Sequence, residues 1–170
     1  PIRTVRSKIE KNNIGYIRIS SFSQPTGDAV VKAIKKIKQR LGDKLVGLVI
    51  DLRNNPGGLL DQSIVLADAF LNAGEIVSVR GRRTNSGRAF VAQEGDLANG
   101  LPMVVLINGG SASASEIVAS ALKYHGRATV MGAQSFGKGS VQTIIPMPEE
   151  GALRLTTALY YGPDGQTIQA

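Results

Sequence analysis

Short apolar runs alternate with amphipathic stretches along this chain, and the alternation predicts strands and helices in turn. Three runs rich in Val, Ile and Leu predict strands, at residues 14–19, 45–52 and 103–107. The run 45–52 is almost wholly apolar, which is typical of a strand buried in an α/β sheet. Weaker patterns predict further strands at residues 75–79, 128–131, 141–145 and 153–160, and the last two are expected to form a hairpin.

Helical spacing of apolar residues marks three other stretches. In residues 28–41, Val30, Ile34 and Ile37 share one face of the predicted helix, and lysines occupy much of the other. Further helices are expected over residues 59–71 and 112–124, and polar turns at residues 81–87 and 149–151. Strands that alternate with helices predict a layered α/β fold, and the length of 170 residues predicts a single domain over residues 1–170.

Composition removes several chemistries. The chain has one histidine, His125, and no cysteine. A cysteine nucleophile is therefore excluded, and the usual zinc ligand sets cannot be built from a single imidazole without thiolates. We expect no metal and no cofactor. A Ser-His-Asp triad would have to use His125. No run approaches the ~20 apolar residues that a membrane-spanning helix needs.

The net charge of +7 raises the question of nucleic-acid binding. Seven of the 20 Lys and Arg residues lie on the helix 28–41 and in the turn 81–87. No aromatic residues alternate with them as stacking platforms for bases would. We therefore expect a solvated basic surface and no nucleic-acid partner.

The candidate chemistry lies in residues 104–139. The order of strand, glycine turn and helix over residues 104–116 places Ser113 at the start of a helix, where unpaired N–H groups can stabilise an oxyanion. Lys138 lies 25 positions further on, in the glycine-flanked turn 136–139. A serine with a lysine as its base can cleave an acyl bond without a histidine.

Each of these motifs has a simpler explanation. Ser113 and Glu116 also fit a capping box, in which both residues only satisfy amides at the helix end. Residues 132–138 fit the first seven positions of a phosphate-binding loop, but Gly139 replaces the required Ser or Thr and a strand is expected to follow. The turn 54–58 has glycines that let backbone amides approach a ligand, or that simply permit a tight turn.

Taken together, the motifs resemble the carboxyl-terminal processing proteases, also called tail-specific proteases. These are Ser-Lys peptidases with a crotonase-like, layered α/β core. The resemblance covers nearly the whole chain in order. It rests on residues 14–19, the DLRNNPGG segment 51–58, the SASASE segment 111–116, the FGKG turn 136–139 with Gln142, and the LRLTT segment 153–157.

The resemblance implies a role for each matching residue. Ser113 would be the nucleophile, Lys138 the general base, and Gln142 the residue that orients the lysine. The oxyanion donors would be the N–H of Ala114 and that of a turn glycine, Gly57 or Gly58, of which we prefer Gly58. Some members carry an acidic residue late in the nucleophile helix, where this chain has Tyr124.

The resemblance also implies a function. We expect a serine endopeptidase that cleaves proteins near unstructured carboxyl-terminal tails and works outside the cytoplasm, in a bacterial periplasm or cell envelope. The family's PDZ domain and carboxyl-terminal continuation are not in this sequence, nor is a signal sequence, and membrane association is expected only through such segments. Assembly into a homo-oligomer is left open. The alternative is a non-catalytic or crotonase-like acyl-binding core in which Ser113 only caps a helix.

Overall fold

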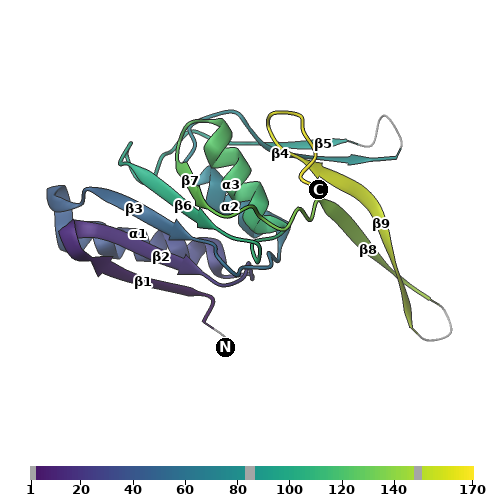
Figure 1. The fold of residues 1–170 in the computed structure, drawn as a ribbon, viewed down its shortest axis with the longest axis horizontal. Helices are drawn as coiled ribbons and strands as arrows, with labels where there is room; N and C mark the ends of the chain where they lie inside the picture. Colours follow the sequence, from purple (N-terminus) through teal and green to yellow (C-terminus); the bar gives the residue numbers. More distant parts are fainter. Residues whose placement is uncertain (1–2, 83–86, 148–150) are drawn as a thin grey trace.

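The computed structural model of the protein describes residues 3–82, 87–147 and 151–170 (Figure 1). Its helices are α1 (Thr26–Leu41), α2 (Leu60–Asp68) and α3 (Ala114–Tyr124), with short 3-10 turns η1 (Lys11–Asn13) and η2 (Gly42–Lys44). Its strands are β1 (Val5–Glu10), β2 (Ile14–Ile19), β3 (Gly47–Asp51), β4 (Glu75–Gly81), β5 (Arg88–Val91), β6 (Met103–Ile107), β7 (Thr129–Gly132), β8 (Ser140–Pro146) and β9 (Ala152–Tyr161).

The strands form two sheets. The first has the order β1-β2-β3-β6-β7, with β1 antiparallel to β2 and the other neighbours parallel. The second has the order β5-β4-β9-β8 and is antiparallel throughout. Since neighbouring parallel strands end at the same edge of a sheet, the segments that follow β3 and β6 emerge side by side.

The helices cover one face of the first sheet, and α2 and α3 also contact β4 of the second sheet. Alternate residues of β2 explain the layering, because their side chains point to opposite faces. Ile17 and Ile19 are fully buried on the helix side, whereas Tyr16 and Arg18 are half-buried on the other. Ile50 of β3 and Val105 of β6 extend the same apolar layer. The predicted layered α/β architecture is confirmed.

A two-stranded arm, β8 with β9, extends from the body of the molecule (Figure 1). Most of its residues are exposed on both faces. The arm begins at Ser140, two residues after Lys138, so the predicted base lies at its root.

The expected strands and helices are present, with shifted ends. The stretch predicted as helix over 59–71 is helical only over α2, and the helix expected from residue 28 begins at Thr26. Two strands were not predicted: β1, whose exposed residues are Arg6, Ser7 and Lys8, and β5, which is only four residues long. The predicted turns 81–87 and 149–151 lie partly outside the described residues.

Candidate active site

Two loops meet at the carboxyl ends of β3 and β6. Asn54, in the loop after β3, donates its backbone N–H to Oδ1 of Asn108, in the loop after β6, at 2.8 Å. Asn108 returns a bond from Nδ2 to Oδ1 of Asn54 at 2.9 Å. Gly110 lies so close that a Cβ there would meet Asn54 Oδ1 at 2.8 Å. This mutual pairing fixes the glycine-rich turn against the serine-rich loop.

Asn55 fastens the same two loops from below. Its side chain is fully buried, donates to the Ile19 carbonyl at 3.0 Å and accepts the Gly57 N–H at 2.9 Å. Its carbonyl accepts the N–H of Ala112 and the hydroxyl of Ser115, both at 3.0 Å. Because the buried side chain and carbonyl of Asn55 form hydrogen bonds to several neighbours, they hold the turn after β3 rigidly against the start of α3.

The three serines of the SASAS run have different environments. Ser111 is fully buried, and its hydroxyl donates to the Leu52 carbonyl at 2.8 Å while it accepts the Asn108 N–H at 3.0 Å. Ser115 is fully buried and is bonded to Asn55. Ser113 alone of the three is only half-buried. The outer two serines are structural tethers, and the middle one is accessible.

Ser113 has a strained backbone, with φ of 55° and ψ of −113°. Such a conformation is costly for a residue with a Cβ, and strain of this kind is concentrated at functional sites. Ser113 is also the N-cap of α3, and it forms a capping box with Glu116. The cap predicted as an alternative therefore exists, and it coexists with an accessible hydroxyl at the head of a helix.

Glu116 does more than cap the helix. Its buried carboxylate accepts the Ser113 N–H at 2.7 Å, the Gly137 N–H at 2.6 Å and the Lys138 N–H at 2.9 Å. The Phe136 N–H adds a bond to the Ser111 carbonyl at 2.9 Å. Three successive backbone amides, those of residues 136–138, thus donate to residues of the segment 111–116. These bonds bring together the two segments that carry the predicted nucleophile and the predicted base.

Lys138 and Gln142 lie on one continuous stretch that enters β8. The Lys138 side chain is half-buried. Gln142 is exposed, faces Thr156 across the hairpin at a shift in register, and makes no hydrogen bond to Lys138 in the part of the chain that the structure describes. Because a strand rather than a helix follows Lys138, residues 132–138 lack the geometry of a phosphate-binding loop.

The predicted oxyanion donors differ in availability. Within the described residues, the N–H groups of Ala114 and Gly58 have no hydrogen-bond partner, whereas the Gly57 N–H is bonded to Asn55. Gly57 contributes space instead: a Cβ there would lie 2.9 Å from Ser113 Cβ and 3.0 Å from the Ala114 nitrogen. Of the two turn glycines, Gly58 is the one with a free donor.

His125 is at the wrong end of α3 to serve Ser113. It is the C-cap of the helix that Ser113 begins, and 11 helical residues span about 16 Å. Its Nε2 is 2.7 Å from the Glu75 carbonyl oxygen, and its ring packs against Gly74. The single histidine is a structural residue, and a histidine triad at Ser113 is excluded.

A charged cluster supports the turn after β3. Asp51 is fully buried and binds the Arg53 guanidinium through Nε and Nη2 at 2.9 and 2.8 Å, Arg18 Nη1 at 2.9 Å and the Tyr16 hydroxyl. Burial acts to raise the pKa of Asp51, but hydrogen bonds from Arg53 and Tyr16 and the charge of Arg18 outweigh it and hold that pKa well below its usual range. Asp51 is therefore an ionised anchor for the turn.

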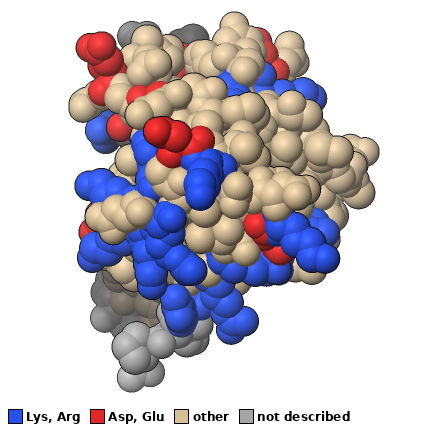
Figure 2. Space-filling view, turned by 90° about the vertical axis from the view of Figure 1, so that its left-hand side faces the viewer, with Lys and Arg blue, Asp and Glu red and all other residues tan. Residues whose placement is uncertain are grey.

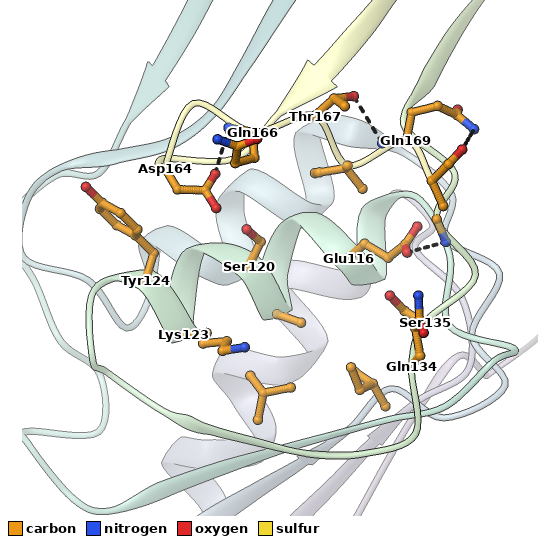
Figure 3. Close-up of a pocket in the computed structure, with 16 residues that line it drawn as sticks. Glu116, Ser120, Lys123, Tyr124, Gln134, Ser135, Asp164, Gln166, Thr167 and Gln169 are labelled. Carbon is orange, nitrogen blue, oxygen red and sulfur yellow. Dashed lines mark hydrogen bonds between the residues drawn. The ribbon is translucent and has the colours of Figure 1, made fainter.

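A pocket of about 580 Å³ lies beside the serine and lysine loops, along the outer side of α3 (Figure 3). Glu116 points into it from the helix, and Ser120, Lys123 and Tyr124 line the same side. The segment 164–170 closes the opposite side. Since neither Ser113 nor Lys138 lines this pocket, it lies behind the candidate site rather than in it. Among the described residues, no group of three His, Cys, Asp or Glu is placed to hold a metal.

Comparison with known proteins identifies the family of this chain. The sequence pattern of peptidase family S41 matches residues 13–170. This chain belongs to peptidase family S41. The S41 chain is 59% identical over 169 residues to the carboxy-terminal-processing protease of Bartonella bacilliformis, covering 99% of this chain and 39% of that protein. It is 36% identical to a carboxy-terminal processing protease of Bacillus subtilis, covering 99% of this chain and 35% of that protein.

The fold of the S41 chain matches as well. The solved structure of a photosystem II D1 C-terminal processing protease superposes with a TM-score of 0.87 at 29% identity, covering 99% of this chain and 46% of that one. The S41 chain thus spans less than half the length of these relatives. Within the described ranges, no helix is both long and apolar enough to span a membrane.

The sequence did not reveal three supporting residues of this S41 site: Asn55, Asn108 and Asp51. Asp51 is the last residue of β3, Asn108 follows β6 directly, and Asn55 lies in the loop that follows β3. Loops at the ends of sheet strands commonly carry functional residues. That position is the one signal that could have singled them out.

Proposed function

We propose that this protein is a serine endopeptidase in which Ser113 is the nucleophile and Lys138 the general base. The observation that carries the proposal is the shared carboxylate of Glu116, which holds the backbone of both residues while Ser113 stays accessible in a strained turn. The N–H groups of Ala114 and Gly58, which have no hydrogen-bond partner among the described residues, support an oxyanion hole.

The proposed reaction is acyl transfer. The Lys138 amine accepts the proton of Ser113 Oγ as that oxygen attacks the scissile carbonyl. The Ala114 and Gly58 N–H groups donate to the oxyanion of the tetrahedral intermediate. Lysinium then gives its proton to the leaving amine, and water hydrolyses the acyl-enzyme. In this scheme Gln142 orients Lys138 once substrate is bound, since catalytic hydrogen bonds often tighten only in the complex.

The substrates we propose are proteins with unstructured, apolar carboxyl-terminal tails, and the place of action is the bacterial cell envelope. The carboxyl-terminal site of cleavage rests on kinship with proteins named for carboxy-terminal processing, whereas the place of action rests on the resemblance described from the sequence. The alternative, a binding core without catalysis, draws support from the capping box at Ser113. A cap alone, however, does not need a strained residue beside two free amides.

The test is cleavage of an unstructured peptide with an apolar carboxyl-terminal tail, together with labelling by a serine-directed fluorophosphonate. Ser113→Ala should abolish both signals, while the matched variants Ser111→Ala and Ser115→Ala, if folded, retain them. Lys138→Arg should be as inactive as Lys138→Ala, because arginine keeps the charge but does not release its proton in proteins. Full turnover by folded Ser113→Ala, or by Lys138→Arg, would refute the assignment.

A further inference from the structure

A cationic groove lies between the edge strand β1 and helix α1, far along the first sheet from β7. It has a volume of about 340 Å³, and its charged lining side chains are Arg3, Lys32 and Lys36. No acidic and no aromatic side chain lines it. Lys and Arg side chains cover much of the lower part of the molecular face shown in Figure 2. We call the groove between β1 and α1, lined by Arg3, Lys32 and Lys36, the β1–α1 groove.

The three basic side chains of the β1–α1 groove lie near one another, and no acidic side chain of the described residues pairs with them. All three are exposed, and none forms an ion pair within the residues that the structure describes. Lys32 and Lys36 are four residues apart on α1, so they are neighbours on the helix surface, where like charges repel. An anionic ligand would relieve this repulsion.

The other wall of the groove is an open sheet edge. β1 pairs only with β2 in the described structure. The Ser20 N–H donates to the Thr4 carbonyl, so by the alternation of antiparallel ladders the backbone groups of Val5 and Ser7 point away from β2. Consistent with this, the Val5 carbonyl accepts a bond from Arg3 Nε at 3.2 Å. Val5 and Ser7 both line the groove, so backbone donors and acceptors face it.

We propose that the β1–α1 groove binds an extended acidic segment of another protein, which adds to β1 as a further strand and places carboxylates against Arg3, Lys32 and Lys36. Backbone pairing supplies affinity in strand addition, and side-chain complementarity supplies specificity. A second copy of this chain is a poor occupant, because pairing β1 with itself would bring like charges together. A nucleic acid would use neither the backbone donors nor any aromatic platform.

The groove connects to the candidate active site through the loop 20–25. Pro25 lines the groove, and Phe22, three residues earlier, pairs with the glycine turn. The Phe22 N–H donates to the Gly57 carbonyl and the Leu59 N–H donates to the Phe22 carbonyl, both at 2.9 Å. The Pro25 end of the groove is therefore connected through Phe22 to the glycine turn, although binding of an acidic segment does not require catalysis.

The test is fluorescence anisotropy with a short labelled peptide of alternating Glu and Val, at physiological ionic strength and in the Ser113→Ala background so that no cleavage occurs. The double variant Lys32→Glu/Lys36→Glu should weaken binding by about tenfold or more, since each reversal replaces an attraction by a repulsion. The matched control is Lys35→Glu/Arg40→Glu, which changes the charge of the same helix equally at exposed positions outside the groove and should change binding much less.

A second arm separates strand addition from charge alone. A peptide of the same sequence, N-methylated at alternate residues, keeps its carboxylates but cannot pair along a strand, and it should bind clearly more weakly. Equal losses in the two double variants, or undiminished binding of the N-methylated peptide, would overturn the proposal. So would groove-dependent binding of a single-stranded oligonucleotide or of phosphatidylglycerol vesicles without binding of the acidic peptide. None of these outcomes depends on whether Ser113 is the nucleophile.

Discussion

Ser113 and Lys138 donate their backbone N–H groups to the same oxygen, Oε2 of Glu116, at 2.7 and 2.9 Å. One carboxylate oxygen therefore holds the backbone of Ser113 and the backbone of Lys138 close together, although the two residues are 25 positions apart in the sequence. The relation makes the carboxylate of Glu116 a positioning group for both halves of the proposed catalytic pair.

Replacing that carboxylate should damage catalysis before it destroys the fold. In Glu116→Gln one acceptor oxygen remains and an NH₂ group faces backbone donors, so unfolding should become easier by on the order of 1–3 kcal/mol. We expect kcat to fall with little change in KM, measured by peptide cleavage alongside thermal melts. Glu94→Gln, at an exposed position, is the control and should behave as wild type. An unchanged kcat in folded Glu116→Gln would remove its positioning role.

The strained backbone of Ser113 predicts an unusual stability order. Both Ser113→Gly and Ser113→Ala lack the hydroxyl of the proposed nucleophile, but glycine tolerates φ of 55°. We expect Ser113→Gly to be more stable than Ser113→Ala by about 1–3 kcal/mol in denaturant unfolding. Ser115 lies inside α3, so there the order should reverse, with glycine less stable than alanine by about 1 kcal/mol. Equal stability of the two Ser113 variants would mean that the turn relaxes without cost.

His125 should matter for stability and not for chemistry. His125→Ala removes the contact with the Glu75 carbonyl and the packing against Gly74, which should cost about 1–2 kcal/mol of unfolding free energy. Its kcat should stay near that of wild type, assayed well below the lowered melting temperature. A loss of about a thousandfold in kcat with intact folding would indicate a histidine mechanism.

Asp51 should make stability fall in acid. The pKa of Asp51 in the folded state is held below the value of about 3.9 that it has in the unfolded chain. As pH drops below about 4, Asp51 therefore becomes protonated in the unfolded chain while it stays ionised in the folded one. The stability that Asp51 contributes is therefore present above that range and is lost as pH falls toward the folded-state pKa. Asp51→Asn should flatten this part of the profile in urea titrations across the acid range.

Asp96 has to be measured in the same series. Burial acts to raise its pKa, but bonds from Arg127 and from the Gly100 and Ala98 N–H groups lower it overall, so it adds a slope of the same sign. Asp96→Asn should remove only its own share. If the Asp51→Asn profile is as steep as that of wild type, Asp51 does not titrate as the buried cluster requires.

The parts of the fold that could be predicted are those in which buried positions produce a regular pattern of apolar residues in the sequence. β3 and β6 are apolar because sheet and helices enclose them, and α1 is amphipathic because one of its faces is in water. β1 was not predicted because it is an edge strand whose exposed residues are polar or charged. Edge position is a property of the whole sheet, and no local pattern encodes it.

The candidate site divides in the same way. Ser113 and Lys138 could be singled out because serine at a helix start and lysine between glycines are unusual in combination. The second role of Glu116 could not, because a capping box already explains a glutamate three residues after a serine, and Gly137 and Lys138 lie 21 and 22 positions away. The preference for Gly58 over Gly57 had no physical ground in the sequence, and the bond from the Gly57 N–H to Asn55 that supports it is visible only in the folded turn.

The bonds that join the loops of the site to one another link segments distant in the sequence: Asn54 to Asn108, Asn55 to Ala112, and Glu116 to Lys138. Such contacts form late in folding, because each requires a long loop to close first. A nascent or partly unfolded chain therefore carries the serine and the lysine as ordinary, separated side chains. The reactivity proposed for this pair would therefore arise only with the complete tertiary structure, so that an immature chain would not attack its neighbours during synthesis.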